Sequence, residues 1–314
     1  SLLLIAAFLP TAVLAAEWNL ENGSIEITAT ANAEGGTTQT VSQGGSSAED
    51  SNPTITSKGK ETNNTITIKA DDGTTANVTI KDANISTGSA AIKTEGKGNV
   101  NLNVEGTNTV SSGSNYAGVE KANAGNLTIG SESGSGELTA NGGWHGAGIG
   151  GGHYRDANDI TITGGEIIAN GGEYGAGIGG GYLHSGNDIT ISGGEVNATG
   201  GTTGAGIGGG WGGNASDIAI SKDSQVEAKG GAANGISGCG AAIGNGGNNN
   251  RVNGSEIEPD TSGLYTTGKV ERIRGDGTVL ETITGKVDPS AKPASAAKAK
   301  KAKETPVEPE AAAP

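Results

Sequence analysis

Three copies of the run GAGIGGG, which begin at Gly146, Gly175 and Gly204, contain the G-x-G-x-x-G spacing of a dinucleotide-binding loop. Such a loop holds a pyrophosphate only where it joins a hydrophobic strand to a helix, because the helix N-terminus supplies the amides and the dipole. The segments after Gly152 and Gly181 instead alternate β-branched and polar residues and contain Gly-Gly pairs. The glycine runs therefore do not predict nucleotide chemistry.

Aromatic and histidine side chains border the glycine runs and are the strongest candidates for ligand binding. They recur at the same offset as the runs, 29 residues. Tryptophan and tyrosine faces stack on the C–H faces of sugar rings, so repeated rings favour a carbohydrate platform. The alternative is that stacked rings only stabilise the turns of adjacent coils. The candidate rings are His153, Tyr182 and Trp211 after the runs, and Trp144, His145 and Tyr174 before them.

The glycines between these rings are a second candidate surface. Side chains alternate along a strand, so Ala147 and Ile149 share one face of GAGIG and the glycines share the other. With Ile149 pointing inward, we expect an exposed strip of bare backbone on which a flat ligand or another sheet could lie. The alternative is steric, because tight corners need glycine. The strip is predicted to contain Gly148, Gly177 and Gly206.

Acidic side chains also recur with the repeat. Like charges stacked at strand spacing repel, so each must cap backbone amides, face water or share a cation. Turn capping is the expected role, and a calcium ion between coils is the alternative, since hard cations bind clustered oxygens. We expect no required cofactor and keep calcium as an option. The aspartates concerned are Asp159, Asp188 and Asp217, and Glu166 and Glu195 are predicted to form a solvated ridge.

Catalysis is not expected. A polysaccharide lyase on a repeat fold of this kind needs a strong base with Arg or Lys beside it, and residues 146–210 contain one Arg and no Lys. His153, Asp156 and Asp159 could be combined into a hydrolase site, but Asp159 recurs in every repeat whereas an active site is singular. The protein is therefore predicted not to be an enzyme, with a lyase or hydrolase as a second alternative.

The fixed period defines the elements that must position these residues. Each 29-residue repeat contains three short strand candidates, such as NDITI, GEVNA and GAGIG. Looser copies can be traced upstream, in which Asn77, Asn99 and Asn126 are expected at the place that Asp159 holds later. We expect an all-β, single-stranded, right-handed parallel β-helix (a solenoid) of about seven coils, with three short strands per coil. Small aliphatic residues should fill its narrow interior, since aromatic residues make up 3% of the chain.

The composition changes at both ends of the repeats. Residues 1–16 are predicted to be a signal peptide truncated at its start, so the mature chain would be exported without a transmembrane span. Residues 17–52 should form an N-terminal cap and residues 53–250 the β-helix. A C-terminal β cap over residues 251–287 should be a hairpin with a turn at Gly275–Gly277, followed by a disordered Pro/Ala/Lys/Glu linker at 288–314.

Charge narrows the possible partners. The formal net charge is −14 and arginine occurs only at positions 155, 251, 272 and 274. Nucleic acid is therefore excluded as an expected partner, because phosphate contacts need clustered cations. An acidic surface rich in Thr and Asn suits an extracellular, cell-surface protein.

Several stretches resemble a known group of proteins. EWNLENGSIEIT, TITSKGKETNNTITI and the tandem GAGIGGG…DITISGGEVNATGG are similar to secreted right-handed β-helix surface proteins of gut and cellulolytic Clostridia and related Gram-positive bacteria. The resemblance extends to about Asn250. It implies the fold and a cell-surface carbohydrate-binding role toward cellulose or pectin, with calcium bound to the solenoid.

These observations lead to one function and two rivals. We expect a secreted, non-catalytic, adhesin-like protein that binds a polysaccharide or cell-surface glycan through its glycine strip and rings. The first rival is a structural stalk or spacer that self-associates through bare glycine faces. The second is the polysaccharide lyase or hydrolase.

Overall fold

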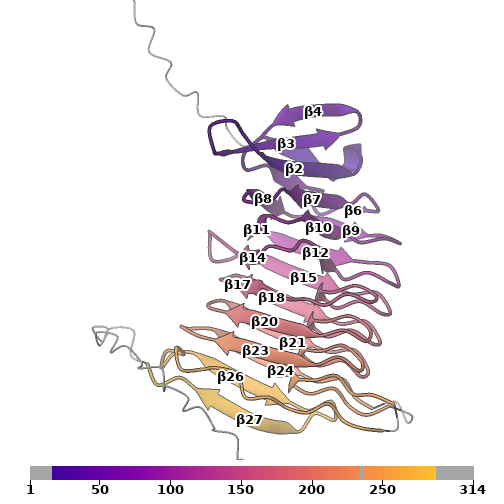
Figure 1. The fold of residues 1–314 in the computed structure, drawn as a ribbon, viewed down its shortest axis with the longest axis vertical. Helices are drawn as coiled ribbons and strands as arrows, with labels where there is room; N and C mark the ends of the chain where they lie inside the picture. Colours follow the sequence, from indigo (N-terminus) through magenta and orange to yellow (C-terminus); the bar gives the residue numbers. More distant parts are fainter. Residues whose placement is uncertain (1–15, 234–236, 250, 288–314) are drawn as a thin grey trace, which may run out of the picture.

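The computed structural model describes residues 16–233, 237–249 and 251–287. The segments predicted as signal peptide, up to residue 15, and as linker, 288–314, lie outside these residues. The described chain winds into a parallel β-helix whose coils stack along one long axis (Figure 1). Among the described residues, no helix is long and apolar enough to cross a bilayer.

Three sheets, here A, B and C, form the walls of the solenoid. Sheet A has eight parallel strands in the order β1 (Glu17–Asn19), β5 (Thr54–Thr56), β8 (Thr75–Lys81), β11 (Asn99–Glu105), β14 (Leu127–Gly130), β17 (Ile160–Ile162), β20 (Gly186–Ile191) and β23 (Ala215–Ile220). Sheet B runs in the order β25 (Ile243–Gly244), β22 (Ile207–Gly208), β19 (Ile178–Gly179), β16 (Ile149–Gly150), β13 (Val119–Lys121), β10 (Ile92–Gly96), β7 (Ile66–Ala70), β2 (Ile25–Ala31), β3 (Thr37–Gln43) and β4 (Ser46–Glu49).

Sheet C completes each coil. Its order is β27 (Val279–Thr284), β26 (Lys269–Ile273), β24 (Gln225–Lys229), β21 (Glu195–Thr199), β18 (Glu166–Asn170), β15 (Glu137–Asn141), β12 (Thr107–Ser111), β9 (Asn84–Ser86) and β6 (Glu61–Thr62). A short 3₁₀ helix, η1 (Leu20–Asn22), follows β1. The chain visits A, C and B in turn, and the triplets from β5–β7 to β23–β25 make seven complete laps. The parallel β-helix and its seven coils are confirmed.

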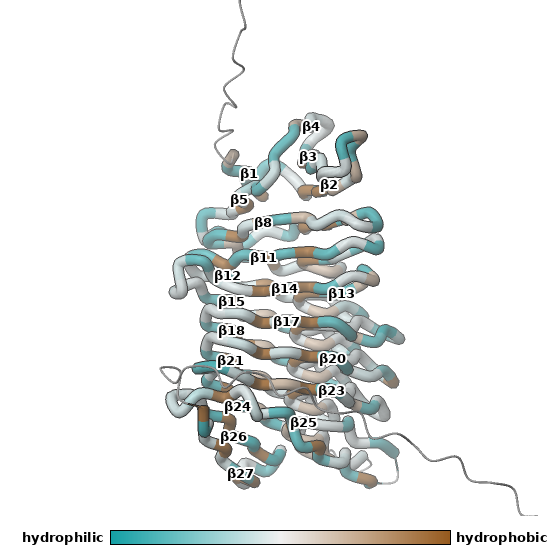
Figure 2. Tube along the Cα trace, turned by 60° about the vertical axis from the view of Figure 1, so that its left-hand side comes forward, coloured by the Kyte–Doolittle hydropathy of each residue, from teal (hydrophilic) through white to brown (hydrophobic). Residues whose placement is uncertain are grey.

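The interior consists of aliphatic columns. Ile149 pairs with Ile178, which pairs with Ile207 and then with Ile243, and all four side chains are fully buried. All hydrophobic residues that are buried in the described chain are Ile, Leu, Val or Ala, as the composition predicted. Each fully buried Ile, Leu or Val side chain contributes about 1.5–3 kcal/mol, and Ala contributes less. Hydrophobic positions therefore recur at the same place in successive coils (Figure 2).

Both ends of the solenoid are closed by antiparallel strands. At the N-terminal end β3 and β4 continue sheet B beyond β2. The segment predicted as an N-terminal cap also contains β1 and β2, which pair in parallel with β5 and β7 and so already belong to the walls. At the C-terminal end β26 and β27 form the predicted hairpin, with Gly277 in the turn at a φ of 88°.

An arginine fixes the C-terminal closure. The Glu256 carboxylate accepts hydrogen bonds from the backbone N–H groups of Ala242 and Ile243 at 2.7 and 3.3 Å. These N–H groups lie at the last strand of sheet B and so have hydrogen-bond partners although no further coil follows. Arg272 is only 3% exposed and holds this carboxylate from β26. Its guanidinium donates at 3.0, 2.8 and 3.0 Å to three carboxylates, those of Glu256, Glu258 and Glu281.

Candidate functional site

Two sets of loops flank the two-residue strands of sheet B. The C–B loops, residues 142–148, 171–177 and 200–206, lead from sheet C into sheet B and stack along the right-hand side of Figure 1. The B–A loops, residues 151–159, 180–185 and 209–214, lead on to sheet A. A bond of 3.0 Å from the Ala176 N–H to the Gly180 carbonyl ties the bases of two such loops together. Both loops of a coil therefore leave the wall close to one another.

Backbone hydrogen bonds join the two sets of loops between coils. The N–H of Tyr182 donates to the carbonyl of His145 at 2.9 Å, and the N–H of Trp211 donates to the carbonyl of Tyr174 at 2.8 Å. Each B–A loop thus lies against the C–B loop of the preceding coil. This brings the rings from both borders into one cluster, the ring ridge, which consists of Trp144, His145, His153, Tyr154, Tyr174, Tyr182, His184 and Trp211.

The rings of the ridge contact one another across the two borders as well as along them. Tyr182 and Trp211 stack at 4.9 Å with an interplanar angle of 1°, and His145 stacks on His153 at 4.3 Å. Tyr174 meets Tyr182 edge to face at 5.4 Å. Each such pair contributes about 0.5–1.5 kcal/mol beyond its buried area. The predicted ring columns therefore lie together as one packed body.

Only part of the ridge faces solvent. Trp144 is 54% exposed and Tyr154 is 57% exposed, whereas Tyr174, Tyr182 and Trp211 are half-buried within the cluster. Leu183 is also exposed, at 44%. Tyr154 and Leu183 occupy equivalent loop tips with φ of 59° and 66°, and sequence reasoning did not include them among the site residues. Their positions in the sequence could have indicated them, because Tyr154 directly follows the predicted ring residue His153 and Leu183 directly follows Tyr182.

The predicted strip of exposed glycines is wrong. Gly148, Gly177 and Gly206 are all buried. A Cβ placed on Gly177 would lie 2.6 Å from the Gly206 carbonyl oxygen and 2.7 Å from the Thr199 nitrogen, both of the next coil. Glycine is needed here because another stretch of backbone approaches closely, as the sequence suggested. That backbone is the next coil of the same chain and not a ligand or a partner. No side-chain-free surface is left for a ligand or another sheet at these three positions.

An open cleft lies at the end of the ridge where Tyr154 stands. It lies between the short corner at residues 121–124 and the longer B–A loop of the next coil, which contributes Arg155 and Asp156. Asp156 accepts from His184 Nδ1 and from the Ser185 N–H, at 2.9 and 2.8 Å. The cleft therefore combines an aromatic face with fixed polar groups. Its lining also includes Lys121, Asn123, Asn158 and Asp159.

Two adjacent buried ionisable groups lie beneath this region. Lys121 is 5% exposed and donates to the Asn123 carbonyl at 2.8 Å. Burial lowers the pKa of its amine, and the Asp159 carboxylate acts in the opposite direction. Glu120 is 2% exposed, and burial raises the pKa of its carboxyl although Arg155 and Lys93 oppose that shift.

Glu120 reaches under the B–A loop. Its Oε1 lies 3.8 Å from Arg155 Nε, while its Oε2 is buried without a hydrogen-bond partner. A Cβ on Gly152 would lie 2.6 Å from Oε2 and 2.7 Å from the backbone carbonyl oxygen of Asn115, and the backbone contact restricts this position to glycine. Residues 146–210 contain one Arg and no Lys, and the fold adds Lys121 from the preceding coil to the same cleft.

The histidines of the ridge are tightly packed. The chain contains three histidines and all of them belong to the ridge. His145 Nδ1 lies 2.9 Å from Asn115 Oδ1. Burial, together with the neighbouring His153, lowers the pKa of His145, which favours the neutral ring at neutral pH.

The aspartate column has a backbone explanation. Asp159, Asp188 and Asp217 are exposed and adopt φ of 56°, 52° and 53°, a left-handed conformation that aspartate tolerates better than most residues. Glu137, Glu166 and Glu195 align in sheet C and face solvent. Within the described part of the chain, no three His, Cys, Asp or Glu side chains are grouped to hold a metal ion. Calcium at the aspartates stays a prediction.

Comparison with known proteins supports the architecture. A family model described as a beta helix repeat matches residues 133–153, 160–182 and 189–211. These three segments contain all six of the predicted ring residues. No curated protein and no solved structure matches the chain. The chain thus contains beta helix repeats in the coils that form the ring ridge.

Proposed function

We propose that this chain is a secreted cell-surface protein that binds a polysaccharide or cell-surface glycan through the ring ridge, without turnover. The observation that carries the proposal is the exposure of Trp144 and Tyr154, which are 54% and 57% exposed although they belong to an otherwise well-packed ring cluster. Large exposed aromatic faces are costly in water and are typical of binding surfaces. The half-buried rings beneath them hold these faces rigidly, which lowers the entropic cost of binding.

The cleft beside Tyr154 supports a sugar rather than a purely apolar ligand. A sugar ring presents C–H groups to an aromatic face and hydroxyls at its edge, so it needs stacking and hydrogen-bonding groups together. Tyr154 supplies the face, and Asp156, Asn158 and Arg155 line the cleft beside it. The binding residues of this proposal are therefore Trp144 and Tyr154, with Tyr174, Tyr182 and Trp211 as their support.

The structural stalk is the second candidate, and the ring contacts favour it. Rings that stack on each other, such as Tyr182 and Trp211, stabilise adjacent loops without any ligand. Self-association through Gly148 and Gly177 is no longer part of this candidate, because both glycines are buried. A stalk should tolerate loss of Trp144 and Tyr154 without any change in binding to glycans.

Retention on insoluble glycans separates the two candidates. Purified protein is mixed with cellulose or with calcium-gelled pectin, and the bound fraction is measured for the wild type, Trp144→Ala, Tyr154→Ala and the double variant. A stacked ring contributes about 1–3 kcal/mol to binding, so we expect the double variant to bind at least tenfold more weakly at a temperature where both proteins are folded. Its melting temperature should fall by about 2–12 °C, because the ring contacts of Trp144 with Tyr174 and of Tyr154 with His153 are lost. Val279→Ala is the matched control, because Val279 is 52% exposed on β27 and lies outside the ridge. Equal retention of the double variant and the wild type would reject the ridge as the binding site.

A further inference from the structure

A polar groove lies on the outer face of sheet A, near the N-terminal end of the solenoid. Its volume is about 440 Å³. Its floor is formed by β8 and β11, which are the longest strands of sheet A at seven residues each. β5 pairs only with Thr79 and Ile80, so the first half of β8 is not covered by it. Ser51 and Asn52 form one wall of the groove, and Ser131 and Glu132 form another.

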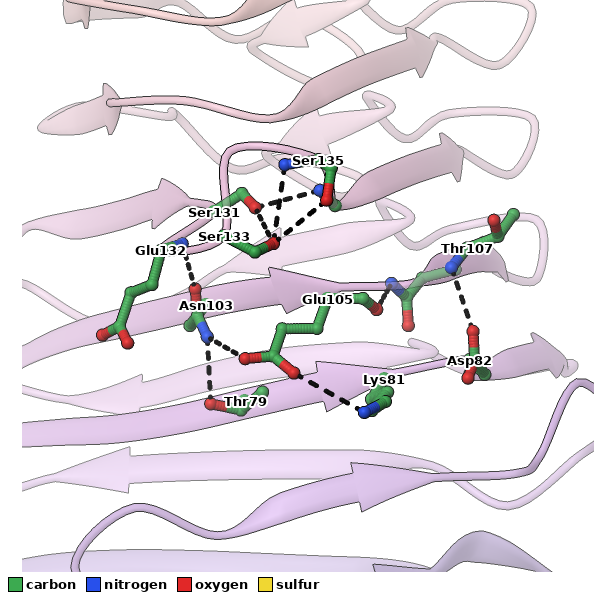
Figure 3. Close-up of polar contacts among 12 residues, drawn as sticks. Thr79, Lys81, Asp82, Asn103, Glu105, Thr107, Ser131, Glu132, Ser133 and Ser135 are labelled. Atoms are coloured by element: carbon green, nitrogen blue, oxygen red, sulfur yellow. Dashed lines mark hydrogen bonds and ion pairs between the residues drawn. The ribbon is translucent and has the colours of Figure 1, made fainter.

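The walls of this amide groove are anchored to its floor. The Glu132 N–H donates to Asn103 Oδ1 at 2.8 Å, and Asn103 Nδ2 donates in turn to Thr79 Oγ1 at 3.2 Å (Figure 3). On the other side Gln39, 5% exposed, bonds both the N–H and the carbonyl of Asn77 at 2.9 Å. The same amide donates to the Asp50 carbonyl at 2.8 Å, just before the first wall. The concavity is thus a fixed feature of the fold.

Two side chains on the floor keep hydrogen-bonding capacity that the chain does not use. Asn101 Nδ2 donates to Asn77 Oδ1 at 2.8 Å. Within the described residues, no bond involves Asn77 Nδ2 or Asn101 Oδ1. The pair therefore presents the two N–H groups of Asn77 and the acceptor oxygen of Asn101 on neighbouring strands about 4.8 Å apart. Thr128 accepts from Asn126 Nδ2 at 3.1 Å, which leaves its own hydroxyl proton to donate.

A second row of hydrogen-bonded side chains on sheet A provides a comparison, because its central amide has both its nitrogen and its oxygen bonded within the chain. Asn187 Nδ2 donates to Asn158 Oδ1 at 3.2 Å, and Asn187 Oδ1 accepts from Ser216 Oγ at 3.1 Å. Asn187 is thereby bonded on both sides by the chain. Asn101 is bonded on one side only, at the position where the groove is hollowed.

The lining also restricts the charge of a ligand. Glu132 is the one charged residue among the groove's lining residues, which are otherwise Asn, Ser, Thr, Gly, Val and Leu. A phosphate or uronate would meet a carboxylate there and no cation, which is unfavourable. Hydroxyl groups of a neutral sugar both donate and accept, and so match the open donor and acceptor.

From this geometry we infer that the amide groove is a glycan-binding site separate from the ring ridge. It takes a short stretch of a neutral oligosaccharide, whose hydroxyls accept from Asn77 Nδ2 and Thr128 Oγ1 and donate to Asn101 Oδ1. The site lies on sheet A, and none of its lining residues belongs to the ring ridge. It does not depend on the proposed role of the ridge.

Nuclear magnetic resonance titration of the intact protein tests this site. Cellotetraose, xylotetraose and mannotetraose are added up to millimolar concentrations, with tetragalacturonate as the anionic comparison. We expect at least one neutral tetrasaccharide to shift the side-chain amide signals of Asn77 and Asn101, and tetragalacturonate to leave them in place. If none of the neutral probes moves these signals, or if tetragalacturonate moves them equally, the inference is overturned.

Variants then assign the binding to the two amides. Asn77→Ala/Asn101→Ala should weaken the affinity for the active tetrasaccharide about tenfold, since two direct hydrogen bonds are lost. Asn187→Ala is the matched control and should bind like the wild type. Asn77→Asp, which keeps the shape and the acceptor for Asn101 Nδ2 but replaces the donating Nδ2 by an acceptor oxygen, is used if the alanine variant does not fold. Unchanged binding by the double variant, or by Asn77→Asp in its place, would overturn the site.

Trp144→Ala/Tyr154→Ala should bind the tetrasaccharide in the groove like the wild type. A failure of the ridge proposal is thereby distinguished from a failure of the groove.

Discussion

Gly177→Ala tests why glycine recurs in sheet B. The new Cβ would lie 2.6 Å from the Gly206 carbonyl oxygen and 2.7 Å from the Thr199 nitrogen, closer than the 3.0 Å below which real Cβ atoms are essentially never found. The contacts are backbone atoms of the next coil, which cannot swing aside as a flexible side chain would. Overpacking of this kind costs about 1–3 kcal/mol, which corresponds to a melting temperature lower by about 2–12 °C.

Thermal unfolding followed by circular dichroism measures this effect. Gly88→Ala is the matched control, because Gly88 is exposed and a Cβ there meets no atom within 4 Å. The control should melt like the wild type, within about one degree, since surface substitutions of this kind change little. If Gly177→Ala melted at the same temperature as Gly88→Ala, the outer face of the glycine column would be open, and the exposed strip predicted from the sequence would have to be reinstated.

Two further perturbations act on buried charges. Arg272→Ala removes the donor that binds the carboxylates of Glu256, Glu258 and Glu281, and it should destabilise the C-terminal cap by about 1.5–3 kcal/mol. Hydrogen exchange of the backbone amides in β25 and β26 should become faster. Unchanged exchange in these strands would contradict this role of Arg272. Glu120 has a folded-state pKa raised above 4.5, so its contribution to stability is fully present below pH 4.5 and is lost as the pH rises through the raised pKa. Glu120→Gln should therefore remove a fall in unfolding free energy that the wild type shows on going from pH 4 toward neutral pH, and identical pH profiles for the two proteins would refute the assignment.

The repeat was predictable because identical residues recur at a fixed interval in the sequence. An interval of 29 residues between Ile149, Ile178 and Ile207 places them one coil apart, and the structure stacks them in the interior. The aliphatic interior and the hairpin with its Gly277 turn follow from equally local signals. Upstream of residue 133 the interval between equivalent residues varies, and there the alignment of one coil predicted from the sequence differs from the strand register in the structure.

This difference concerns the first regular coils. From the sequence, Asn77 aligns with Asn99 and Asn126 as the forerunners of Asp159, but in the sheet Asn99 pairs with Thr75 and Asn77 pairs with Asn101. The error is two residues, which is one full period of a strand, so the inward and outward faces were still assigned correctly. Without an exact repeat length, a period of two cannot distinguish these registers.

The site was harder to predict than the fold because its parts meet across coils. The sequence gives each ring its position along the chain, but the packing of His145 on His153 and of Tyr174 on Tyr182 depends on how loops of different coils lean together. Lys121 enters the cleft from the coil before the glycine runs. The burial of Gly177 likewise depends on the neighbouring coil. Such contacts have no signal at a single position.

A quantitative glycan array tests the central proposal most directly. The wild-type protein and Trp144→Ala/Tyr154→Ala are applied to the same array of plant and bacterial polysaccharides. The ring-ridge account predicts that the wild type binds a subset of polysaccharides and that the double variant loses these signals at least tenfold. Wild-type signals that persist at full strength in the double variant would contradict it.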